Sequence, residues 1–135
     1  MKKFSISVIF SIILAFAAPA ETIFPAPPGV IESIAAAIKG ANSGDLAKYF
    51  CNTLEIIIPG KEGSFSKNQA EMIMKDFFAK NPATSFVTSQ QGSSNGGAQF
   101  MIGTYKSGKV IFHVYVLVKP VAGQMQIQQL HFESE

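Results

Sequence analysis

The chain has 135 residues, with eleven basic residues that are all lysine and nine acidic residues, giving a formal net charge of +2. Lys2 and Lys3 supply both surplus charges, so residues 21–135 are formally neutral, with nine lysines against nine carboxylates. Nucleic-acid binding through phosphates needs a basic surface, usually with arginine, so this composition disfavours nucleic acid as a partner.

The N-terminus has the pattern of a secretory signal peptide. Lys2 and Lys3 precede a mostly apolar run, and Ala18-Pro19-Ala20 places small residues where signal peptidase cleaves. The run is shorter than the ~20 residues of a permanent membrane span. We therefore expect residues 1–20 to be removed on export to the periplasm or the extracellular space, and no stable membrane anchor to remain.

The chain after the predicted signal begins with a leader and continues as one domain. Residues 21–29 hold three prolines, which predict an extended segment. Residues 30–135 are long enough to bury a single hydrophobic core, and we expect them to form one α+β domain.

Two helices are predicted at the start of this domain. Apolar residues recur at steps of three and four from Ile31 to Ala41, as in an amphipathic helix. A second, shorter helix is predicted next, with Ser43 or Asp45 as its N-cap. Its inner side would carry Leu46, Tyr49 and Phe50. Cys51, the only cysteine, is interpreted as a small buried hydrophobic residue of the same helical stretch.

The middle of the chain predicts a hairpin and a third helix. Leu54 to Ile58 is a strand pattern that Pro59-Gly60 ends, and Glu62 to Phe65 is a short partner strand. Ser66 and Gln69 form a capping box, which predicts a helix that ends at Asn81-Pro82. The apolar face of that helix consists of Ala70, Ile73, Met74, Phe77 and Phe78.

The last third predicts four strands, at Phe86–Gln91, Ala98–Tyr105, Val110–Lys119 and Gln124–Glu133. Turn signals separate them, of which Asn95-Gly96 is the strongest. The glycine-rich segment 92–97 joins two strands and precedes no helix, so we interpret it as a hairpin loop and not as a phosphate-binding loop. Helices followed by antiparallel strands indicate a curved sheet with helices packed on one face.

The alternation of apolar and polar residues along the last two strands fixes how they pair. With a two-residue turn at Ala122-Gly123, Val118 faces Ile127, and a one-residue bulge at Gln128-Gln129 keeps the apolar residues in phase. One face is then apolar throughout and is predicted to lie beneath the helices. It comprises Phe112, Val114, Val116, Val118, Met125, Ile127, Leu130 and Phe132.

The opposite face mixes apolar and titratable side chains, namely Phe100, Ile102, His113, Tyr115, His131 and Glu133, with Ile111 and Leu117 beside them. Three interpretations apply to it. A homodimer interface comes first, because such interfaces favour aromatic residues and tolerate polar ones. Ordinary packing comes second. A zinc or acid–base site comes last, because a flat sheet face brings ligands together poorly, and we assign no metal ligand or catalytic residue.

Several segments carry a family resemblance. Gly60-Lys61-Glu62-Gly63-Ser64-Phe65-Ser66-Lys67, Asp76-Phe77-Phe78-Ala79-Lys80-Asn81-Pro82 and Ile127-Gln128-Gln129-Leu130 are similar to the family of small exported bacterial proteins called domain of unknown function 4783. That family resembles the nuclear-transport-factor-two-like superfamily. The resemblance implies a cone-shaped, curved antiparallel sheet wrapped around the helices, a roll of cystatin-like type, often dimeric through the sheet.

The resemblance also implies a pocket inside the cone. Its candidate lining is Tyr49, Phe77, Met101, Tyr105, Phe112 and Val114. Enzymes of the superfamily project Asp, His or Tyr side chains into the cone, whereas the inner strand positions here are apolar, and Asp76 is expected on the solvent side of its helix. The fold hosts several functions and selects none of them.

We therefore expect an exported, non-catalytic domain without a cofactor. It would either bind a small apolar ligand in the cone or act as a homodimeric interaction module. An isomerase- or dehydratase-like enzyme is the alternative, and it requires at least two polar side chains that converge in a pocket.

Overall fold

The computed structural model describes residues 29–135, so the predicted signal and all of the predicted leader but Gly29 lie outside the described residues. Three helices and six strands follow in the order α1 (Val30–Lys39), α2 (Ser43–Ala47), β1 (Phe50–Ile58), β2 (Lys61–Ser66), α3 (Lys67–Lys80), β3 (Ser85–Ser93), β4 (Gln99–Ser107), β5 (Val110–Val121) and β6 (Gln124–Ser134). Within this part of the chain, none of the helices has the length and apolar character that crossing a membrane requires.

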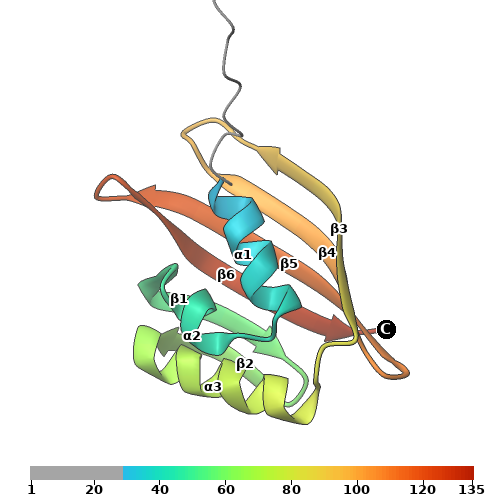
Figure 1. Ribbon diagram of the computed structural model, residues 1–135. Helices are drawn as coiled ribbons and strands as arrows, with labels where there is room; N and C mark the ends of the chain where they lie inside the picture. The colour runs from blue at the N-terminus through green and yellow to red at the C-terminus, as the bar shows by residue number, and fades with distance from the viewer. Residues whose placement is uncertain (1–28) are drawn as a thin grey trace, which may run out of the picture.

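The six strands form one sheet in the order β2-β1-β6-β5-β4-β3. Neighbouring strands are antiparallel, except that β1 runs parallel to β6. The helices lie on one face of the curved sheet, which we call the inner face; the other is the outer face (Figure 1). α1 packs against β3 and β4, and α3 packs against β1 and β2. The predicted α+β fold, a curved sheet packed against helices, is confirmed.

The predicted register of the last hairpin is confirmed. Val118 pairs with Ile127 and Val116 with Leu130, and the register shifts between these pairs because Gln128 is the extra residue of a bulge. Ala122 and Gly123 have φ values of 50° and 80°, as the tight turn between two antiparallel strands requires. The bulge therefore keeps the apolar residues of β6 on the inner face on both sides of the irregularity.

The core lies between the inner face and the helices, with five aromatic rings at its centre. The ring centroid of Phe77 lies 4.9 Å from that of Phe132 and 5.1 Å from that of Phe112. Phe78 and Tyr105 complete the cluster. The Tyr105 hydroxyl donates a hydrogen bond of 2.6 Å to the backbone carbonyl of Asn81, which ties the end of α3 to β4.

α3 begins with the predicted capping box. The Ser66 hydroxyl oxygen accepts a hydrogen bond from the Gln69 backbone N–H at 3.3 Å, and the Gln69 side chain accepts one from the Ser66 N–H at 3.2 Å. These bonds satisfy two backbone donors around the start of the helix, where no preceding turn provides acceptors. The helix ends at Lys80, before Asn81-Pro82, as predicted.

The prediction for the segment around α2 is wrong in three respects. The N-cap is Asn42, whose side-chain oxygen accepts the Asp45 N–H at 3.0 Å, and not Ser43 or Asp45. The helix ends at Ala47, so Phe50 is buried as the first residue of β1. Cys51 follows on the strand and is half-buried. The chain is extended here because the Tyr49 carbonyl accepts the Ile127 N–H of β6 at 2.6 Å.

Gly103 of β4 is a site of close approach on the inner face. A Cβ atom there would lie 2.7 Å from the Phe86 ring and 2.9 Å from the Val87 carbonyl oxygen. We expect Gly103→Ala to lower the free energy of unfolding by about 1–3 kcal/mol, because neither the packed ring nor the backbone can yield cheaply. Urea denaturation measures this loss.

Gly92→Ala is the matched control. A Cβ at Gly92 would also meet a ring at 2.7 Å, but the ring belongs to the half-buried Phe100 on the outer face and can turn toward solvent. Its expected cost is under ~1 kcal/mol. Equal losses in the two variants would contradict the assignment of Gly103 to a rigid contact.

Candidate functional site

The six candidate pocket residues fall in two places. Tyr49 is half-buried and lines an open hollow beside α1 and α2, together with Ser33 and Lys48. The other five come together in the core between α3, β4 and β5, and they are Phe77, Met101, Tyr105, Phe112 and Val114. Among five hollows on residues 29–135, Phe77 and Phe112 line one of about 140 Å³, whereas Met101, Tyr105 and Val114 line none of them.

The aromatic rings fill the space where a ligand in the cone would lie. Tyr105 is fully buried and its ring centroid lies 5.5 Å from that of Phe132, a distance at which the rings are in contact. Burial raises the pKa of Tyr105 to about 12, so its hydroxyl stays protonated and acts as a donor to Asn81. In the described part of the chain, the other buried side chains are apolar.

The predicted outer-face residues do lie together on the face that the helices leave uncovered. Ile102 of β4 pairs with Tyr115 of β5, which pairs with His131 of β6. The parallel strand β1 continues this row with Ile57. Phe100 and Leu117 form the next row, and all of these residues are half-buried. The structure thus places a band of aromatic and aliphatic side chains across four strands.

Titratable groups flank this band. His113 pairs with Glu133 across the strands, but its Nε2 lies nearest to Glu135 Oε1, at 4.0 Å, and both side chains are exposed. In the solvent-exposed position this contact contributes little to stability. Among residues 29–135 no group of three or more His, Cys, Asp or Glu side chains is arranged to hold a metal ion.

His131 has a partner that the sequence did not indicate. Its Nε2 lies 3.5 Å from Glu55 Oε1, and this buried nitrogen makes no hydrogen bond with the residues that the structure describes. The Tyr115 ring covers the imidazole at a centroid distance of 5.6 Å. Glu55 was missed because it reaches His131 only through the parallel pairing of β1 and β6, which joins segments about 75 residues apart.

Comparisons with known proteins agree with this fold. The family model of a domain of unknown function (DUF4783) matches residues 31–133. A DUF4783 family protein from Bacteroides uniformis is 28% identical with a TM-score of 0.75, covering 79% of this chain and 98% of that one. A second, from Bacteroides ovatus, is 27% identical with a TM-score of 0.72, covering 76% and 93%.

A more distant similarity extends to a wider fold group. An NTF-2-like protein of unknown function from Silicibacter pomeroyi is 13% identical with a TM-score of 0.54, covering 78% of this chain and 89% of that one. At this identity the similarity shows the fold alone. Among curated proteins the chain has no match. The family resemblance seen in the sequence is thereby confirmed: the chain belongs to the DUF4783 family of domains of unknown function and has a nuclear-transport-factor-two-like fold.

Proposed function

We propose that the protein is a non-catalytic interaction module that forms a homodimer through the outer face of its sheet. The observation that carries this proposal is the uncovered band of half-buried side chains formed by Phe100, Ile102, Tyr115 and Leu117. The inner face of the same strands is covered by helices, whereas the band has no covering element among the described residues (Figure 1). Contiguous apolar surface of this kind marks interaction sites.

A second copy suits this face in both composition and size. An aromatic and aliphatic centre with a polar rim, here His113, Glu133 and Glu135, is the usual anatomy of a two-fold interface. The outer face of β4, β5, β6 and β1 measures roughly 500 Å² from ordinary strand dimensions, so two copies would bury about 1,000 Å². Because this area lies just below the roughly 1,200 Å² at which stable interfaces begin, we expect a weak dimer with a micromolar Kd.

The proposal does not extend to an apolar ligand in the cone. The rings of Phe77, Tyr105 and Phe132 occupy the interior at mutual centroid distances of 4.9 to 6.2 Å. A ligand there would have to displace one of them from the core.

Ile102→Glu tests the dimer. The half-buried Ile102 side chain lies on the outer face, so a carboxylate there leaves the core intact but would be desolvated in the interface. We expect the Kd, measured by sedimentation over a concentration series, to rise at least ~30-fold, as for an interface hot spot.

Val110→Glu is the control, because Val110 is an exposed aliphatic residue of β5 whose position continues the inner-face alternation, away from the band. It should leave the Kd unchanged. A wild-type protein that sediments as a monomer at millimolar concentration would overturn the proposal.

A further inference from the structure

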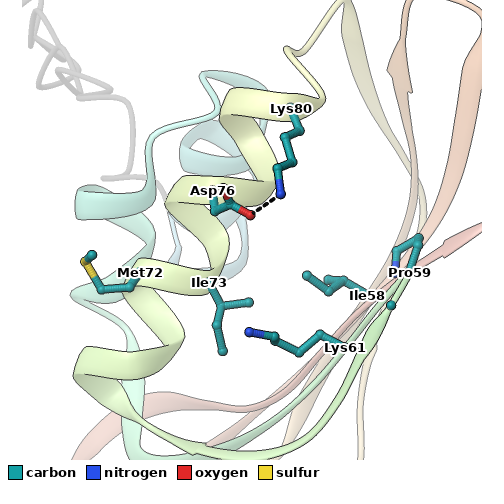
Figure 2. Close-up of a pocket in the computed structure, with 8 residues that line it drawn as sticks. Ile58, Pro59, Lys61, Met72, Ile73, Asp76 and Lys80 are labelled. Carbon is teal, nitrogen blue, oxygen red and sulfur yellow. Dashed lines mark ion pairs between the residues drawn. The ribbon is translucent and has the colours of Figure 1, made fainter.

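A groove runs between β2 and α3, mainly apolar at the Phe65 end and carrying the charged residues Asp76 and Lys80 at the other. Two hollows of about 370 and 390 Å³ share the lining residues Lys61, Met72 and Ile73, so they form one continuous depression. Ile58 and Pro59 close one end, and Phe65 lines the other. Figure 2 shows Ile58 and Lys61 across the groove from Ile73 of α3. Both volumes lie in the ~300–1,000 Å³ range of binding sites in proteins.

The groove follows from how α3 is connected. α3 starts directly after β2, at Lys67, and contacts β1 more extensively than β2. The inner face of β2 is therefore only partly covered. Phe65 remains half-buried and Met72 is 65% exposed, so both apolar side chains are accessible to a ligand.

β2 is also an edge of the sheet. Its only strand neighbour is β1, so the other side of β2 presents backbone N–H and C=O groups that no described strand pairs with. A free strand edge is a template for one more strand. Here that edge belongs to the strand that lines the groove, so an added strand would gain backbone hydrogen bonds and, at the Phe65 end, side-chain burial.

The charge in the groove is positive and uncompensated. Lys61 has no ion-pair partner among residues 29–135, whereas Asp76, the acidic residue of the lining, is paired with Lys80 at 2.9 Å. In Figure 2 the Lys61 amine points into the groove toward Ile73. A ligand that places a single carboxylate near this amine would complement it.

We propose that this groove binds the extended C-terminal tail of another protein, which adds to β2 as an antiparallel strand. Lys61 is the first residue of β2, and an antiparallel strand would end where β2 begins. The terminal carboxylate of the tail would then lie at Lys61, while alternate apolar side chains enter the groove beside Met72 and Ile73. Residues 124–134 of a second folded copy are not free to act as this tail, because they form β6 inside the sheet.

The test uses a generic tail, since backbone pairing does not depend on sequence. The probe is an acetylated heptapeptide of alternating valine and threonine that ends in valine with a free carboxylate, titrated into the ¹⁵N-labelled protein. We expect amide shift changes in β2 and α3, and about tenfold weaker binding of the same peptide with an amidated C-terminus, which lacks the charge that Lys61 recognises.

Two variants and two controls separate the contribution of the terminal carboxylate from that of the groove. Lys61→Gln should remove the difference between the free-acid and amidated peptides, and Met72→Glu should weaken both. Lys75→Gln, on an exposed position of α3 outside the groove lining, should change neither. Ile102→Glu, on the outer face, should bind the peptide as wild type does. Equal affinity of the two peptides for the wild type would overturn the proposal. Shift changes centred on β3, or no binding at about 1 mM peptide (a Kd that corresponds to only about −4 kcal/mol), would also overturn it.

Discussion

Phe77→Ala is expected to lower the free energy of unfolding by about 3–5 kcal/mol, the usual cost of deleting a buried aromatic side chain. Phe77 is 4% exposed and contacts the rings of Phe78, Tyr105, Phe112 and Phe132. It is the residue through which α3 reaches both β4 and β5 at the centre of the core. Its removal leaves a cavity that the surrounding strands, held in one sheet, cannot close.

Urea denaturation and thermal melting measure this effect, and the loss corresponds to a fall in Tm of roughly 10–25 °C for a domain of this size. Phe65→Ala is the control, because it deletes the same ring from a half-buried position on β2. It should cost about 1 kcal/mol. A Phe77→Ala variant that is no less stable than Phe65→Ala would show that the aromatic cluster does not anchor α3.

The second large effect is a loss of stability at high pH that arises from Tyr105. Burial raises the pKa of Tyr105 from its ordinary 10.0 to about 12, so the folded state holds this proton more tightly than the unfolded state does. The resulting stabilisation is fully present below pH 10 and is lost as the pH rises through 12. A shift of this size corresponds to about 2–3 kcal/mol. Ionisation would also remove the donor to the Asn81 carbonyl.

Unfolding free energies between pH 8 and pH 12 (a range that spans the ordinary ~10 of tyrosine) test this expectation. Tyr105→Phe should be less stable at neutral pH, because the Asn81 carbonyl loses its partner, but its stability should fall less steeply above pH 10. Tyr115→Phe, on the outer face, should keep the steep wild-type decline. Parallel curves for wild type and Tyr105→Phe would assign the alkaline loss to other groups.

The sequence predicted the local geometry of the C-terminal hairpin because that geometry is set by short-range rules. The turn at Ala122-Gly123 and the alternation on either side of Gln128 are compatible with a single register that keeps Ile127, Leu130 and Phe132 on the inner face. The distribution of Tyr115 and His131 to the outer face follows from that register. Burial of Val114 and Phe132 beneath the helices follows from it as well.

The predictions that were wrong or missing concern long-range contacts. Phe50 and Cys51 fit a helical pattern locally, but the pairing of this segment with Ile127 of β6 draws them into a strand. The same parallel pairing brings Glu55 to His131. Neither contact leaves a local periodicity in the sequence, because strand order depends on which segments meet in space.

The groove was also not predicted, although signals for it were present. Met72 interrupts the polar side of an amphipathic helix, and Lys61 stands at the start of a short strand. A lysine on an edge strand is ordinarily a guard against aggregation. Lys61, however, lies in the same groove as the exposed Met72. This arrangement depends on how α3 is placed relative to β2, which the sequence does not show (Figure 2).

The position of β6 has a consequence for folding. The strand nearest the C-terminus lies in the interior of the sheet, between β1 and β5. The two flanking parts of the sheet, β1 with β2 and β3 with β4 and β5, therefore have no common partner until residues 124–134 join them.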